Sequence, residues 1–135
     1  MAKKIQQYFE GVGRRKTSIC RVRLTQDRDR AGLMINNKPG KDYLNTPELM
    51  SVATAPLKAA GVEKDLRVDV HANGGGQNGQ AQAIQMGVCR ALVKFNSELH
   101  RVLRDLDYLK RDPRKKERKK PGLKKARRAP QWAKR

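Results

Sequence analysis

The sequence predicts an α+β fold, in which helices pack on one face of a small sheet, followed by a long extended basic tail. Residues 1–109 contain runs of alternating side chains, typical of strands, and runs with apolar side chains at helical spacing. Residues 110–135 contain only two large apolar side chains, Leu123 and Trp132. We therefore divide the chain into a globular domain, residues 1–109, and a tail, residues 110–135.

Three strands are expected in the domain. The segment "TSICRVRL", residues 17–24, alternates a small or apolar side with a side that carries Arg21 and Arg23. This pattern indicates a strand with one buried face and one basic face. The segment "GLMIN", residues 32–36, is a second short strand, and "LRVDVHA", residues 66–72, alternates again.

Helices are expected between and after these strands. The segment "TPELMSVATAPLKAAG", residues 46–61, has Pro47 at a favoured first helical position and Gly61 where a helix can end. Pro56 is expected to break or kink this helix. Apolar side chains at helical spacing over residues 84–106 indicate two further helical stretches.

The tail carries most of the excess charge of the chain. It holds 14 of the 32 Lys and Arg and 2 of the 13 Asp and Glu, which gives it a net charge of +12 out of +19. Such a segment cannot bury enough apolar surface to offset its conformational entropy, so we expect it to be disordered without RNA. Its candidate phosphate-binding residues before the last seven positions are Lys110, Arg111, Arg114, Lys115, Lys116, Arg118, Lys119, Lys120, Lys124, Lys125, Arg127 and Arg128.

The composition bounds the partners of the whole chain. A net charge of +19 favours polyanions, nucleic acid first and anionic membranes second. Because only 4% of residues are aromatic, contact through phosphates is favoured over base stacking. Without an apolar stretch long enough for a membrane span or a secretory signal, the chain is expected to be cytoplasmic.

A glycine-rich segment after the third strand matches the dinucleotide-binding spacing G-x-G-x-x-G. No strand ending in an acidic residue follows the next helix, and no P-loop lysine follows the glycines, so a nucleotide cofactor is not expected. Two alternatives stay open: the glycines allow a tight turn with close packing, or their amides bind a phosphate at a helix N-terminus. The residues concerned are Gly74, Gly75, Gly76 and Gly79.

The remaining polar residues indicate binding rather than catalysis. The two histidines and two cysteines lack metal-ligand spacing, and no catalytic arrangement is recognisable, so no metal, cofactor or small-molecule substrate is expected. In "GVGRRKTS", residues 11–18, consecutive cations precede a strand. Together with the basic face of that strand they predict a second phosphate-binding patch, formed by Arg14, Arg15, Lys16, Arg21 and Arg23.

Three blocks of the sequence resemble the small-subunit ribosomal protein nine family of bacterial or organellar type. They are "GRRKTSICRV", "GGGQNGQAQAIQMGVCRAL" and "RDPRKKERKKPGLKKARRAPQWAKR", in the order and spacing of that family. The resemblance implies a left-handed βαβ crossover, a place beside other proteins on the head of the small subunit, and binding to 16S-type ribosomal RNA. It also implies that Lys134 and Arg135 contact the anticodon stem-loop of peptidyl-site transfer RNA. The chain departs from the family at Trp132 and Ala133, where an aromatic residue followed by Ser is common.

A nucleoid-type DNA-binding protein is the alternative from another class. It would also be basic and tolerant of sequence, but the chain has no apolar wedge or groove-binding arm of the architectural kind. Sedimentation with the small ribosomal subunit, rather than with DNA, would separate the two functions.

Overall fold

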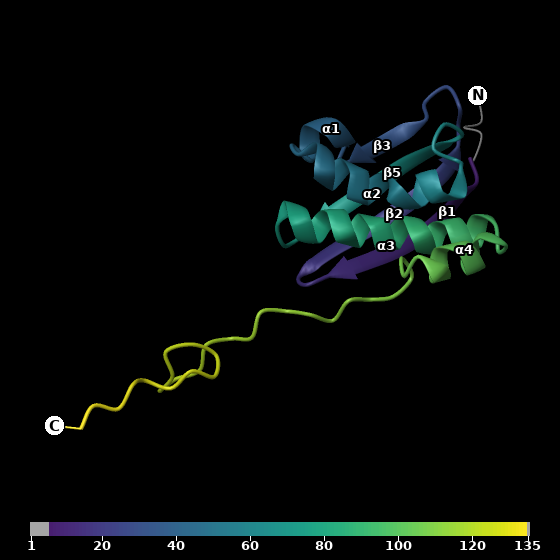
Figure 1. The fold of residues 1–135 in the computed structure, drawn as a ribbon. Coiled ribbons are helices and arrows are strands. Elements are labelled where there is room, and N and C mark those ends of the chain that lie inside the picture. Colours follow the sequence, from purple (N-terminus) through teal and green to yellow (C-terminus); the bar gives the residue numbers. More distant parts are fainter. Residues whose placement is uncertain (1–5, 135) are drawn as a thin grey trace.

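Five strands form one mixed sheet in the computed structural model, which describes residues 6–134 (Figure 1). The strand order is β1-β2-β5-β3-β4, antiparallel except between β3 and β5, which are parallel. The strands are β1 (Tyr8–Arg15), β2 (Ser18–Gln26), β3 (Gly32–Ile35), β4 (Lys38–Pro39) and β5 (Leu66–Asn73).

The helices lie on one face of this sheet, which confirms the α+β prediction (Figure 1). Helix α3 packs across β1 and β2, and α2 packs beside α3. Cys20, Val22 and Leu24 point from β2 into the resulting core and are fully buried, as their alternation predicts. The helices are α1 (Gly40–Tyr43), α2 (Pro47–Ala60), α3 (Gln77–Phe95) and α4 (Leu99–Asp105).

The crossover between the parallel strands β3 and β5 is left-handed. The chain leaves β3, passes through α1 and α2, and returns as β5. In Figure 1 both strands point to the left, the helices lie in front of the sheet, and β5 lies below β3. About 98% of such connections have the opposite hand. The structure thus agrees with the hand that the family resemblance implies, which the residue pattern alone would not favour.

Strand β1 is absent from the elements that the sequence pattern predicts. The inward-facing positions of β1 are Phe9, Gly11, Gly13 and Arg15, so Phe9 is the one large apolar side chain on the buried face of this strand. The missing side chains of the two glycines let β1 lie directly on α3: a Cβ on Gly13 would meet the Ala83 carbonyl oxygen at 1.7 Å. A strand that packs through its backbone leaves no hydrophobic period to detect.

Helix α2 begins and ends where the sequence predicts, but Pro56 does not break it. The helix runs from Pro47 to Ala60 with Pro56 buried inside it. Gly61 follows in the left-handed region, with φ of 71°. The apolar ring of Pro56 is buried in the domain, and this packing offsets the backbone hydrogen bond that proline cannot donate.

The two cysteines are free and buried, which provides a test of the core. Burial raises the pKa of both thiols, Cys20 and Cys89, to about 12. Because the thiolate is the reactive form, we expect the native protein at pH 8 to react with an aromatic disulfide reagent at least ~100-fold more slowly than the urea-unfolded chain. Stopped-flow absorbance measures both rates. Equal rates with and without urea would contradict this packing.

Beyond α4 the chain leaves the domain and extends away from it (Figure 1). Tyr108 and Leu109 still pack against the core, and residues 111–134 contain no helix or strand. That residues 110–135 lack a fixed shape without RNA stays a prediction.

Candidate nucleic-acid interface

Part of the predicted basic patch of the domain lies beside the tail, at the point where the tail leaves the domain. A hollow of about 350 Å³ is lined by Arg14 and Arg15 from the end of β1 and by Lys110 and Arg114 from the tail. Polar side chains of α3 complete its wall, among them Gln82. The cations are separated by about 100 residues in sequence, so only the fold reveals their proximity. We call residues 110–114 the tail root.

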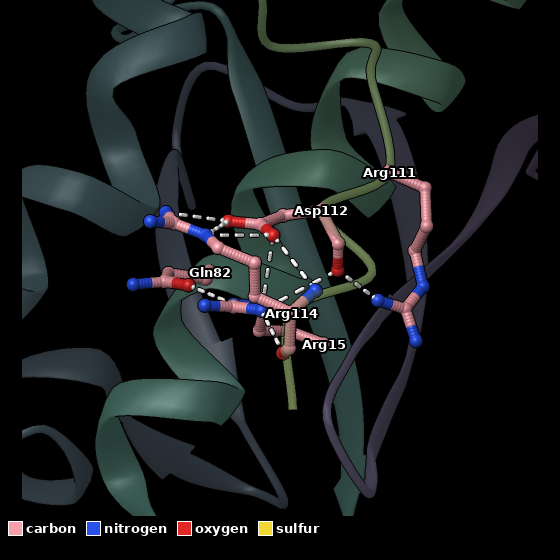
Figure 2. Close-up of polar contacts among 5 residues, drawn as sticks. All are labelled: Arg15, Gln82, Arg111, Asp112 and Arg114. Atoms are coloured by element: carbon pink, nitrogen blue, oxygen red, sulfur yellow. Dashed lines mark hydrogen bonds and ion pairs between the residues drawn. The ribbon is translucent and has the colours of Figure 1, made fainter. Parts of the chain in front are cut away.

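Arg15 faces inward and contacts the tail root (Figure 2). It is 9% exposed, and its Nε donates a hydrogen bond to Gln82 Oε1 at 2.5 Å. Its Nη1 donates to the carbonyl oxygens of Arg114, at 2.6 Å, and Asp112, at 3.4 Å. The same atom lies 3.4 Å from the Asp112 carboxylate. The guanidinium group of Arg15 is therefore shared between α3 and the tail root.

Asp112 is the acidic centre of this cluster. Its carboxylate accepts hydrogen bonds from the Arg114 side chain at 2.9–3.1 Å and from the Arg114 backbone at 3.0 Å (Figure 2). These bonds hold the pKa of Asp112 well below its ordinary value and raise that of Arg114. Arg111 Nη1 also donates to the Asp112 carbonyl oxygen. Asp112 thus stays ionised at neutral pH, and its carboxylate pairs with Arg15 and Arg114.

The glycine loop packs tightly and also borders an open hollow. Gly74 and Gly75 adopt φ values of 73° and 66°, and the Gly74 carbonyl oxygen accepts from Ser18 Oγ and Gln80 Nε2, both at 3.1 Å. A second hollow, of about 590 Å³, lies over the first turn of α3 and is lined by the basic Lys16 and by the acidic Glu48 of α2. No side chain caps this end of α3. The structure therefore shows the packing role of the glycines. The backbone amides in the first turn of α3 are not capped by a side chain and could still bind an anion.

The basic face of β2 is partly neutralised by the neighbouring strand. Arg21 lies 2.9 Å and Arg23 3.7 Å from the Glu10 carboxylate, and Arg23 stacks on the Tyr8 ring at 4.8 Å. Sequence reasoning missed Arg67, which lies on the same open face and pairs with Asp69. The polar positions of the "LRVDVHA" alternation could have revealed this residue. This face offers mixed charge rather than an uncompensated basic surface.

Unpaired cations are most densely spaced along the tail. Glu117 organises a loop in it, accepting from Lys120 Nζ at 2.6 Å and Arg127 Nε at 3.0 Å. Among the residues that the structure describes, ten tail cations make no ion pair: Lys110, Arg111, Lys115, Lys116, Arg118, Lys119, Lys124, Lys125, Arg128 and Lys134. Arg135 lies outside the described residues.

Other kinds of site find no support in the described part of the chain. Residues 6–134 hold no group of three or more His, Cys, Asp or Glu side chains placed to bind a metal ion. None of the described helices combines the length and apolar character that a membrane crossing requires.

Comparison with known proteins places the chain in a family. A family model described as "Ribosomal protein S9/S16" matches residues 13–135. The chain is 52% identical to "Small ribosomal subunit protein uS9" of Acaryochloris marina, over 94% of this chain and 92% of that protein. It is 50% identical to the uS9 protein of Gloeobacter violaceus, over 94% and 95%. It is 47% identical to "Small ribosomal subunit protein uS9c" of Pyropia yezoensis, over 98% and 96%. These relatives are ribosomal proteins and not enzymes, and the chain belongs to the ribosomal protein S9/S16 family.

Proposed function

We propose that this chain is a constituent of the small ribosomal subunit that binds 16S-type ribosomal RNA through its domain and tail. The names of its relatives support the place in the subunit. The unpaired cations of the tail carry the RNA assignment, because the two acidic residues of this extended segment, Asp112 and Glu117, already pair with other cations. A polyanion supplies that compensation and releases counterions on binding.

On the domain, the exposed cations beside the two hollows are the proposed phosphate contacts. Arg14 borders the hollow at the tail root, and Lys16 borders the hollow over the first turn of α3. Lys16 and the free amides of that turn would share one phosphate, since both favour negative charge at the same place. Arg21 and Arg23 contribute at the open face of the sheet, where Glu10 already pairs with both.

The tip of the tail is proposed to contact the anticodon stem-loop of peptidyl-site transfer RNA. Lys134 and Arg135 supply the charge for its phosphates, and the Trp132 ring is 80% exposed and free to stack. The nucleoid-type alternative has no support from the relatives named above, which are ribosomal proteins. Sedimentation of the protein with DNA rather than with the small subunit would restore it.

Neutralising the tip tests the transfer RNA contact. In small subunits that carry Lys134→Gln and Arg135→Gln, we expect peptidyl-site transfer RNA to bind about tenfold more weakly, while the subunits sediment normally. The matched control is Lys64→Gln with Lys94→Gln, which removes the same charge from exposed positions of the domain. Filter binding measures the affinity, and a frameshift reporter measures maintenance of the reading frame. Equal affinities in the two double variants would refute the contact.

A further inference from the structure

We propose that Arg15 is a positioning residue that clamps the tail root to the domain and so sets the direction in which the tail leaves it. Sequence reasoning places Arg15 among the phosphate-binding cations. Its geometry assigns it to the tail instead, because its donors are directed at protein acceptors. The exposed neighbour Arg14 remains available for a phosphate.

The contacts of Arg15 are the polar link between the domain and the tail in the part of the chain that the structure describes. Within residues 6–134, every hydrogen bond and ion pair that joins residues 110–134 to the domain is made by Arg15. The other described polar contacts of the tail stay inside it: they are made at Asp112, at Glu117 and between backbone groups of residues 120–128. Without Arg15, only the packing of Tyr108 and Leu109 just before the tail would fix its starting point.

The chemistry of the contact suits a clamp that acts on the backbone. Two of its acceptors are main-chain carbonyl oxygens, those of Asp112 and Arg114, so the contact fixes the path of the chain rather than one side chain. The planar guanidinium group donates to α3 with one nitrogen and to the tail root with another, which a lysine cannot reproduce. A guanidinium group buried to this degree requires such partners, since an unpaired buried charge is strongly unfavourable.

A fixed root has a consequence for binding. A tail that leaves the domain in one direction loses less conformational freedom when it meets its polyanion than one that pivots at Lys110. This consequence rests on the proposed function, whereas the clamp itself can be tested on the free protein.

Limited trypsin digestion of the full-length protein without RNA tests the clamp. The Arg114–Lys115 bond includes the carbonyl group that Arg15 holds, so we expect Arg15→Gln to raise its cleavage rate about tenfold, the effect of losing one hydrogen bond to a charged group. Arg14→Gln is the matched control, because it removes the same charge from the adjacent exposed residue, and its rate should stay within about twofold of wild type. Cleavage at Lys124, far from the clamp, normalises each digest.

Arg15→Gln could unfold the domain, and cleavage after Arg90 in α3 would reveal this. Two further variants provide a test in that case. Arg15→Lys keeps the charge but loses the second nitrogen donor of the guanidinium group, so it should raise the cleavage rate of the Arg114–Lys115 bond as much as Arg15→Gln does. Gln82→Leu removes the acceptor that orients Arg15 from an exposed position on α3, and should raise the same rate about threefold. Unchanged cleavage at Arg114 in Gln82→Leu and in a folded Arg15 variant would overturn the clamp.

The assembled subunit separates this inference from the proposed function. If the clamp serves the tail tip, Arg15→Gln weakens peptidyl-site transfer RNA binding, whereas Lys64→Gln, which removes one charge from an exposed position of the domain, does not. If the proposed transfer RNA contact is wrong, the variant with Lys134→Gln and Arg135→Gln will bind transfer RNA normally, while Arg15→Gln still raises cleavage after Arg114. Failure of the clamp would show as unchanged digestion while the tip variant still weakens binding.

Discussion

Gly13→Ala is expected to destabilise the domain by at least about 3 kcal/mol, toward the upper end of what overpacking produces. A Cβ at this position would lie 1.7 Å from the Ala83 carbonyl oxygen and 2.6 Å from the Gly87 amide nitrogen. Both are backbone atoms of α3, so neither can rotate away as a flexible side chain could. Relief requires β1 to move off α3 as a unit, which exposes the core between them.

The measurement is urea unfolding of the full-length protein followed by circular dichroism. A loss of 3 kcal/mol is a large fraction of the roughly 5–15 kcal/mol by which small domains are stable, so the midpoint should fall sharply or the variant should be unfolded in buffer. Gly76→Ala is the matched control, because a Cβ there meets nothing within 4 Å. It should lose no more than about 1 kcal/mol, the effect of alanine at a helix N-cap. Similar midpoints for the two variants would show that β1 does not lie on α3 through its glycines.

Replacing five tail lysines with glutamine is expected to reduce the salt dependence of RNA binding strongly. The variant changes Lys115, Lys116, Lys119, Lys124 and Lys125, which are exposed and make no described ion pair. Each phosphate contact adds about 0.7–0.9 to the slope of log affinity against log salt, so the slope should become shallower by roughly 3.5–4.5. The affinity for a ribosomal RNA fragment should fall at least about a hundredfold at 0.1 M salt.

The matched control for the tail variant removes the same charge from the domain. Lys38, Lys41, Lys58, Lys64 and Lys94 are exposed there, and their replacement by glutamine leaves the tail intact. Filter binding over a range of potassium concentrations gives both slopes. A control slope that changes as much as the tail slope would mean that net charge, rather than the tail, determines binding.

The sequence predicted most of the domain because its elements pack through side chains. Cys20, Val22 and Leu24 alternate and are buried as expected, and α2 ends at Gly61. It did not predict β1, because that strand packs through Gly11 and Gly13 and has no apolar period. A pattern of apolar side chains cannot predict a strand that packs mainly through its backbone.

The candidate site was predictable in composition but not in arrangement. Net charge identified the tail and the cations of residues 14–16, and the fold adds that Arg14 and Arg114 border one hollow. Charge could not reveal that Arg15 turns inward, since buried and exposed arginines look alike in a run of cations. The polar groups that accept from Arg15 lie far along the chain, and only the fold brings them near.

The hydrogen bond from Arg15 to the Arg114 carbonyl oxygen joins residues 99 positions apart. During synthesis β1 is made early and the tail root late, so this link can close only when most of the polypeptide is available. The nascent domain can therefore acquire its sheet and helices while its cationic end is still unanchored.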